Sequence, residues 1–129
     1  MLTREAILGA DDLAQEQLLV PEWDGEVTVS AMDGMGRDAW EQVLLDQGAG
    51  TEERDIRGLK VELLIRSVRG EDGAPLFTSA DREALLKKSG AAIDRVFQVA
   101  QRLNHLSDDQ IEQLTENSSA GPNVDSGSA

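Results

Sequence analysis

The segment that decides the fold reads DGAPLFTSAD over residues 72–81 and continues as KSGAAIDRVF over residues 88–97. Its Asp-Gly pair marks a tight turn, because both residue types tolerate a positive φ, and the Leu-Phe pair that follows is typical of a short apolar strand. Thr78 or Ser79 is placed to cap a helix over about residues 80–88. A second helix follows at once. One segment therefore holds a turn, a strand, a cap and two helices, and none of its side chains is suited to catalysis.

The second of these helices carries the clearest apolar pattern in the chain. Apolar side chains recur every three or four residues, which is typical of an amphipathic helix that buries one face. The members of this stripe are Ile93, Val96, Phe97, Ala100 and Leu103. Ser107 and Gln110 then form a capping-box pattern, which predicts a short last helix.

The length of 129 residues suits one domain that needs neither a metal nor a disulfide to fold. The chain has no cysteine, which removes disulfides, thiolate nucleophiles and cysteine metal ligands and is compatible with a reducing cytoplasm. Beyond residue 116 the sequence is rich in serine and glycine and has little to bury. We therefore predict one domain over residues 1–116 and a disordered tail over residues 117–129.

A β-hairpin is predicted in the first third of the chain, with strands over residues 17–23 and 26–32. Its turn is Asp24-Gly25, a strong hairpin signal, and the second strand alternates apolar and polar residues as a half-buried strand does. Because Pro21 has no N–H to donate to a ladder, we expect the first strand to lie at the edge of the sheet.

Two helices are predicted to flank this hairpin. Thr3 is placed to cap a short helix over residues 4–8. Asp33 is placed to cap a longer helix over about residues 35–47, and a flexible glycine-containing loop at residues 48–50 is expected to end it.

A further helix is predicted to begin near Thr51, with acidic residues in its first turn, where the helix dipole favours them. It is expected to change into a strand near Ser67, and residues 71–73 then form a hairpin turn into the next apolar strand. The predicted fold class is thus α+β, with small antiparallel hairpins, a bundle of about four to five helices and a disordered C-terminal tail.

The charge of the chain is strongly negative and unevenly distributed. The net charge is −13, and residues 1–50 carry 11 acidic and 2 basic groups, whereas residues 51–105 carry 9 acidic and 10 basic groups. Such a surface repels phosphates and anionic lipid, so we expect no nucleic-acid partner and no membrane partner. No apolar run approaches the length that crosses a bilayer. The charge suits a basic protein partner, or it serves only solubility.

No constellation for catalysis, cofactor binding or metal binding is found in the sequence, so we expect no enzyme and assign no catalytic, cofactor or metal residue. The lone histidine, His105, falls at the end of a predicted helix, where it suits the dipole. The glycine pair at residues 34–36 lacks the third glycine and the lysine of a phosphate loop. The four adjacent acid pairs all fall in predicted caps, first turns or hairpin turns.

The two tryptophans have different expected environments. Trp40 is spaced with Val43 and Leu44 on one helical face and is predicted to lie in the core. Trp23 lies beside the hairpin turn between two acidic residues, where it could anchor a basic or amphipathic partner or fold back over the small sheet.

Several stretches of the sequence resemble the tail assembly chaperones of siphophages. VPEWDGEVTV at residues 20–29, followed by RDAWE at residues 37–41, is similar to the opening hairpin and first helix of that family. The similarity to the second half of the family lies at residues 71–78, 80–81, 88–89, 94–97, 100–104 and 106–107. The resemblance keeps its order over about residues 1–115 and departs at the loop of residues 48–50 and after Asn117.

The resemblance implies a function without catalysis. Such chaperones bind the tape-measure protein before assembly, keep it soluble, and help to recruit tail-tube (major tail) protein around it. Further implied partners are a second copy of the chain and a longer form made by programmed ribosomal frameshifting. The implied location is the host bacterial cytoplasm, with no copies in the mature virion.

A tape-measure protein of this kind is largely helical, so recognition of a helix in a groove is the expected mode. The candidate partner-binding residues are Trp23, Val27, Val29, Ile93, Val96 and Phe97. The apolar stripe on the long helix is equally suited to the core. Two alternatives remain open: a head–tail or tail-completion adaptor retained in the virion, and an acidic inhibitor or DNA mimic. The near-neutral charge of residues 51–105 argues against the last of these.

Overall fold

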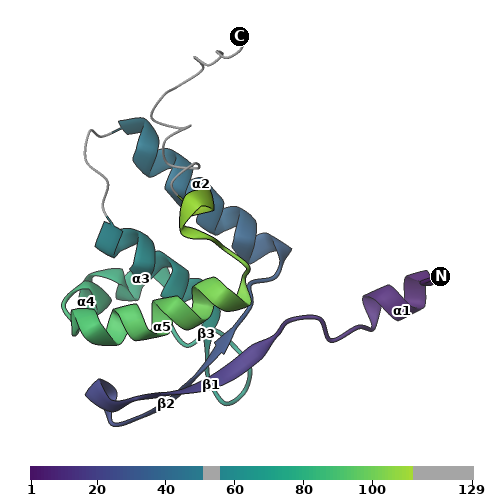
Figure 1. Ribbon diagram of the computed structural model, residues 1–129, viewed down its shortest axis with the longest axis horizontal. Helices are drawn as coiled ribbons and strands as arrows, with labels where there is room; N and C mark the ends of the chain where they lie inside the picture. Colours follow the sequence, from purple (N-terminus) through teal and green to yellow (C-terminus); the bar gives the residue numbers. More distant parts are fainter. Residues whose placement is uncertain (51–55, 112–129) are drawn as a thin grey trace.

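The computed structural model describes residues 1–50 and 56–111, and over these ranges the fold is α+β, as predicted (Figure 1). The strands are β1 (Gln15–Val20), β2 (Gly25–Ser30) and β3 (Val68–Arg69). The helices are α1 (Arg4–Leu8), α2 (Gly34–Gly50), α3 (Ile56–Ser67), α4 (Arg82–Leu86) and α5 (Gly90–Leu103), with 3₁₀ turns η1 (Pro21–Trp23) and η2 (Ser79–Asp81). The chain is helical again over residues 108–111. The predicted tail at residues 117–129 lies outside the described ranges.

The predicted hairpin is formed by β1 and β2, but its tip is longer than a two-residue turn. Pro21 begins η1, because its fixed φ suits the start of a helical turn, and Asp24 then adopts a left-handed φ of 56°. Both strands therefore end earlier than predicted, at Val20 and Ser30. The tip residues that the sequence placed in the first strand belong to the 3₁₀ turn.

The sheet has the order β1-β2-β3 and is antiparallel throughout, so β1 lies at an edge, as predicted. In the register of the hairpin, Leu18 lies opposite Val27 and Glu16 lies opposite Val29. Strand side chains alternate between the two faces of a sheet, so these four residues share one face. Helix α5 covers that face (Figure 1) and contacts both strands.

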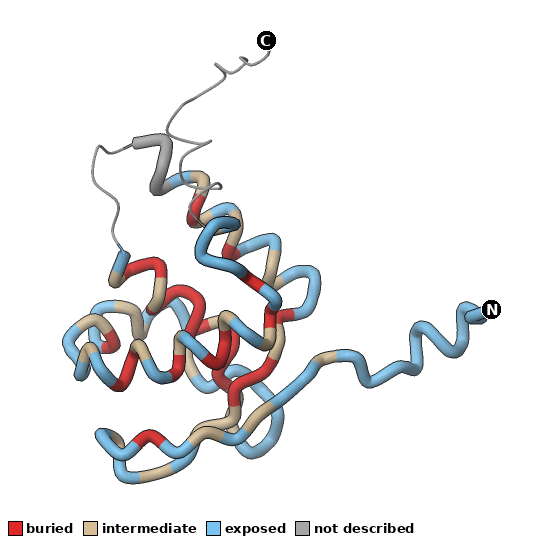
Figure 2. Tube along the Cα trace, in the orientation of Figure 1, coloured by how far each residue is buried: buried red, intermediate tan, exposed pale blue. Residues whose placement is uncertain are grey.

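Helix α3 is the centre of the helical layer and packs against α2, α4 and α5. It is buried almost all round, which is typical of a helix surrounded by other elements (Figure 2). Its buried residues are Gly58, Leu59, Val61, Glu62, Leu63, Leu64, Ile65 and Ser67. The chain changes from helix to strand directly after Ser67, as predicted.

Helix α2 begins behind Asp33, whose Oδ1 accepts a hydrogen bond of 2.8 Å from the backbone N–H of Gly36. Trp40 and Leu44 on its inner face are fully buried, which confirms Trp40 as a core residue. The helix continues through Gly50, so the loop predicted at residues 48–50 is wrong. Glycine inside a helix costs only about 1 kcal/mol relative to alanine, which an established helix can absorb. The start predicted near Thr51 falls outside the described residues.

The segment over residues 72–97 forms the helix caps at its two predicted helix starts. Thr78 forms a capping box with Asp81, but the helix predicted over residues 80–88 is divided into η2 and the shorter α4. Ser89 caps α5 by accepting a hydrogen bond of 3.2 Å from Ala92 N–H. The apolar strand predicted here is reduced to a single bridge between Arg69 and Pro75.

Candidate partner-binding surfaces

The six candidate residues of the sequence analysis lie at two depths. Val29, Ile93 and Val96 are fully buried in the core, whereas Trp23, Val27 and Phe97 are half-buried and pack against it. Apolar spacing along a strand or helix marks a core face as readily as a binding face. A partner on the outside of this structure can therefore reach only the second group directly.

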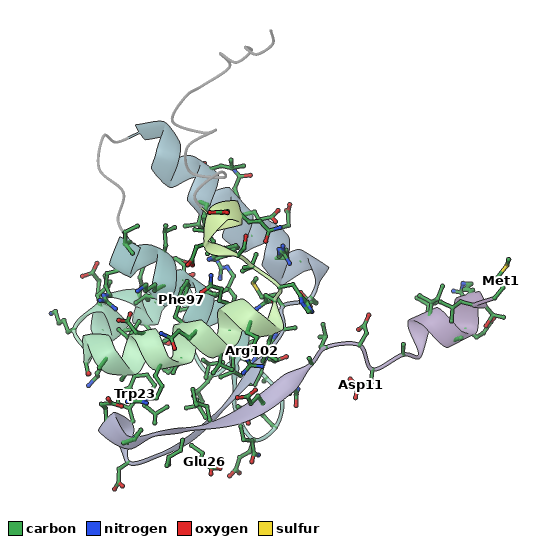
Figure 3. The ribbon with its side chains drawn as sticks, viewed as in Figure 1. Met1, Asp11, Trp23, Glu26, Phe97 and Arg102 are labelled. Carbon is green, nitrogen blue, oxygen red and sulfur yellow. The ribbon has the colours of Figure 1, made fainter. Side chains whose placement is uncertain are left out.

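The hairpin tip that carries Trp23 is held against α5 by an ion pair. Arg95 of α5 donates from Nη2 to Glu22 Oε2 at 3.0 Å and from Nε to Oε1 at 3.4 Å. The hydrogen bond from Arg95 lowers the pKa of the Glu22 carboxyl below its ordinary value. Trp23 lies below α5, on the side of the hairpin (Figure 3), and its ring joins the packed residues around the core.

Phe97 lies in the seam between α3 and α5. The ammonium group of Lys60 stands 5.3 Å from the centre of its ring, within the range of a cation–π contact. Lys60 Nζ and Arg57 Nη1 each lie 2.8 Å from Asp94 Oδ1, so one carboxylate joins two cations of α3 to α5. Hydrogen bonding to Lys60, and then to Arg57, lowers the pKa of Asp94.

The most exposed apolar side chains lie elsewhere, at places that the sequence reasoning did not select. Four of them belong to the N-terminal arm (residues 1–14), which carries α1 away from the body (Figures 1 and 2). The exposed large apolar residues of the described chain are Met1, Leu2, Ile7, Leu8, Leu19, Met35, Ile56 and Leu76. The sequence offered one signal for the arm. The predicted helix over residues 4–8 is too short to carry an apolar stripe, so its Ile-Leu pair is not marked as a core face.

A groove of about 400 Å³ lies between the start of α2, the end of α3 and the segment that precedes α4. We call it the Phe77 groove. Its apolar lining residues are Ala39, Ile65, Pro75 and Phe77, and its charged lining residues are Asp33, Arg66 and Arg69. Because it joins three segments far apart in the sequence, no local pattern predicts it.

Most cations of the described chain are paired with carboxylates inside the fold. Arg37 pairs with Glu41, Arg102 with Glu16, and Glu62 binds both Arg66 and Arg82. Over the described residues, the side chains of Arg69, Lys87 and Lys88 form no ion pair. Of these three, only Arg69 lines the Phe77 groove.

Groups for chemistry are not gathered in the part of the chain that the structure describes. Within residues 1–50 and 56–111, no three His, Asp or Glu side chains come close enough to hold a metal ion. Over the same residues, no helix is both long and apolar enough to span a membrane. His105 lies just past the end of α5, exposed and with a positive φ of 54°.

Comparison with known proteins agrees with this arrangement. The family model described as "Phage tail assembly chaperone" matches residues 3–117, and the chain belongs to that family. A solved structure titled "Structure of bacteriophage HK97 tail assembly chaperone" matches with a TM-score of 0.57 and 21% sequence identity. That match covers 77% of this chain and 94% of the other, and at this identity it shows a shared fold. No curated protein matches this chain in sequence.

Proposed function

We propose that this chain binds the tape-measure protein of its phage before tail assembly, keeps it soluble and promotes growth of the tail tube around it, without catalysis. The observation that carries the proposal is membership of the tail assembly chaperone family over residues 3–117. The proposed place of action is the cytoplasm of the host bacterium during assembly, and the finished virion is expected to lack the protein. The tail-tube protein is the second proposed partner.

The physical properties of the chain support a role as a soluble cover for an apolar helix. Its net charge of −13 opposes aggregation of a complex that has taken up a sticky partner. The half-buried residues Trp23, Val27 and Phe97 offer partly exposed apolar surface along α5 and the hairpin. Val29, Ile93 and Val96 support that surface from beneath.

The proposal is tested by following the two proteins through an infection. A tagged form of this chain is purified from infected cells before tails are complete, and the tape-measure protein is measured in the eluate. Purified virions are then assayed for the tagged chain. We expect tape-measure protein in the eluate and none of this chain in the virions.

A different outcome would identify the alternative role. If this chain remains in purified virions at a fixed stoichiometry, it is a head–tail or tail-completion adaptor. If the eluate holds neither tape-measure protein nor tail-tube protein, the proposed binding function is wrong.

A further inference from the structure

We propose that β1 offers its open edge to an extended, basic segment of the tail-tube protein, which pairs with it as a fourth strand of the sheet. The identity of this partner rests on the proposed function. Strand β1 is the first strand in a sheet of order β1-β2-β3, so only one of its sides is paired within the described chain. The other side is open to strand addition, in which main-chain hydrogen bonds hold the partner.

The direction of each backbone group in β1 follows from the hairpin register. Ala31 N–H donates to Ala14 O at 2.8 Å, in the same register as the six pairs of β1 and β2. In an antiparallel pair, residues that exchange hydrogen bonds alternate with residues that do not. Every second residue from Ala14 onward therefore faces β2, and the residues between them direct their N–H and C=O groups outward. The outward residues of β1 are Gln15, Gln17 and Leu19.

This edge of the sheet is accessible and unguarded. The three outward residues are exposed, and within the described chain their N–H and C=O groups have no backbone partner. Natural sheets commonly guard an open edge with lysine, proline or a bulge. Strand β1 contains no lysine and no proline, and its six pairs with β2 run without a bulge. Leu19 is 58% exposed, so the edge presents an apolar side chain as well as free backbone groups.

The charges around this edge favour a basic segment. Residues 5–36 contain eight acidic residues and no lysine or arginine. Two of these acids, Glu16 and Glu22, are paired with arginines of α5. A strand with lysine or arginine at both ends, about 20 Å apart, would meet carboxylates near each end of β1. The exposed carboxylates near these ends that form no ion pair with the described residues are Asp11, Asp12, Asp24 and Glu26.

The two proposed partners differ in whether they can add a strand. A helix has already paired its N–H and C=O groups internally, so a largely helical tape-measure protein suits the apolar surface beside α5. The edge of β1 suits an extended segment of the tail-tube protein whose backbone groups are unpaired before assembly. Helix α5 covers a face of the sheet and leaves this edge open, so the two partners can bind at the same time (Figure 1).

Hydrogen exchange at single amides tests strand addition. The full chain is mixed with unassembled tail-tube protein of the same phage, and exchange of each backbone N–H of β1 is followed by NMR. We expect exchange at Gln15, Gln17 and Leu19 to slow at least tenfold, because their outward N–H groups gain acceptors. Exchange at Glu16 and Leu18 should change less, since their N–H groups already face β2. A partner that contacts only side chains would not produce this alternation.

A proline variant tests the same bonds through affinity. Gln17→Pro removes one outward N–H without removing a bond to β2, a change that an edge strand tolerates. Gln17→Ala shortens the same side chain but keeps the N–H. The proline variant should bind the tail-tube protein about tenfold more weakly than the alanine variant. The unfolding midpoints of the two variants separate a loss of binding from a loss of folding.

Removal of charge tests the choice of a basic segment. Asp11→Asn with Asp12→Asn should weaken binding about threefold at an ionic strength of about 0.15 M, the modest effect expected of exposed ion pairs. Asp38→Asn with Glu83→Gln is the matched control, because it removes two exposed acids of α2 and α4 and leaves the same net charge. Equal binding of the two double variants would contradict a basic segment.

Other results would overturn the strand addition itself. The tail-tube protein could bind without slowing exchange at the alternating positions, or the proline and alanine variants could bind it equally. The alternation could instead appear with the tape-measure protein, or in the chain alone at high concentration, which would give the edge to a different strand. If the chain binds tape-measure protein but no tail-tube protein, strand addition is wrong while tape-measure binding stands. If it binds neither, the proposed function is wrong as well.

Discussion

Asn104 joins the end of α5 to the end of the sheet by accepting a hydrogen bond of 2.7 Å at Oδ1 from the backbone N–H of Met32. Asn104 is buried, and its Nδ2 donates to Ala100 O at 2.8 Å. Its own carbonyl accepts from Arg37 Nη1 at 3.2 Å. Asn104 thus joins α5 to the segment after β2 through its side chain and to α2 through its backbone carbonyl.

Asn104→Ala should lower the free energy of unfolding by about 2–3 kcal/mol, because the N–H of Met32 is then buried without an acceptor. Urea unfolding followed by circular dichroism measures the change. Gln98→Ala, at an exposed position of the same helix, is the control and should change stability little. Equal stabilities of the two variants would show that the buried amide does not fasten α5 to the sheet.

His105 ends α5 in a conformation that suits glycine. Its φ is 54°, its N–H donates to Arg102 O at 3.1 Å, and Leu106 N–H donates to Gln101 O at 2.9 Å. This pair of bonds is the Schellman motif, in which glycine is the usual residue at the left-handed position.

His105→Gly should raise the free energy of unfolding by about 0.5 kcal/mol, since relief of left-handed strain exceeds the added entropy of glycine. His105→Val should lower stability by about 1 kcal/mol or more, because a β-branched residue fits poorly at positive φ. Thermal unfolding of the two variants gives the order of stability. A valine variant as stable as the glycine variant would mean that the backbone at residue 105 relaxes freely.

Glu62 is a buried carboxylate held between two arginines of different helices. Its Oε2 lies 3.0 Å from Arg82 Nε, and its Oε1 lies 3.5 Å from Arg66 Nη2. Arg82 Nε donates a hydrogen bond to Oε2, whereas Oε1 lies close to Arg66 without forming a hydrogen bond. The ion pair with Arg82 therefore fastens α4 to α3.

Glu62→Ala should lower the free energy of unfolding by about 3 kcal/mol, because the variant loses a buried carboxylate that pairs with Arg66 and Arg82. Glu62→Gln should cost less, since the amide oxygen can still accept from Arg82. Glu83→Gln on the exposed side of α4 serves as the control in the same denaturant series. If Glu62→Gln unfolds like the parent chain, the charge contributes nothing to stability.

The ion pairs of Asp94 should make the free energy of unfolding depend on pH. Its folded pKa is lowered by Lys60 and Arg57, so the folded state binds its proton less tightly than the unfolded chain does. The stabilisation is therefore complete above the unfolded pKa of about 3.9 and is lost as pH falls through the lower folded pKa.

The Asp94→Asn variant tests this effect when its stability is compared with that of the parent chain between neutral and acidic pH. The difference should be about 0.5–1 kcal/mol near neutrality, a modest value because solvent screens these half-exposed groups. It should shrink as the solution becomes acidic. A difference that stays constant over the whole range would mean that Asp94 acts by packing and not by charge.

Local patterns in the sequence predicted much of this fold. The α5 stripe, the hairpin of β1 and β2, the change from helix to strand after Ser67 and the caps at Thr3, Asp33 and Thr78 are all observed. Each depends on residues within a few positions of one another, so the sequence contains the physical cause. The family resemblance is confirmed by the match over residues 3–117.

The remaining features depend on contacts between distant segments. Two helix boundaries differ from those that helix breakers and caps predicted. Helix α2 continues through Gly50, and the helix predicted over residues 80–88 is divided into η2 and α4. The apolar periodicity of α5 indicated Ile93 and Val96 as candidate contacts. It could not show that other elements of the fold bury both side chains completely. The Phe77 groove is formed by segments that are far apart in the sequence, so no local pattern could predict it.

The central claim, that this protein chaperones the tape-measure protein, is tested most directly by producing the two proteins together in bacteria. The measured quantity is the fraction of tape-measure protein that remains soluble, with this chain, without it and with the Trp23→Ala variant, followed by size-exclusion chromatography. The account predicts that the chain raises this fraction and that the two proteins elute together. Tape-measure protein that stays insoluble beside abundant soluble chain, with or without a frameshift-extended form, would contradict it.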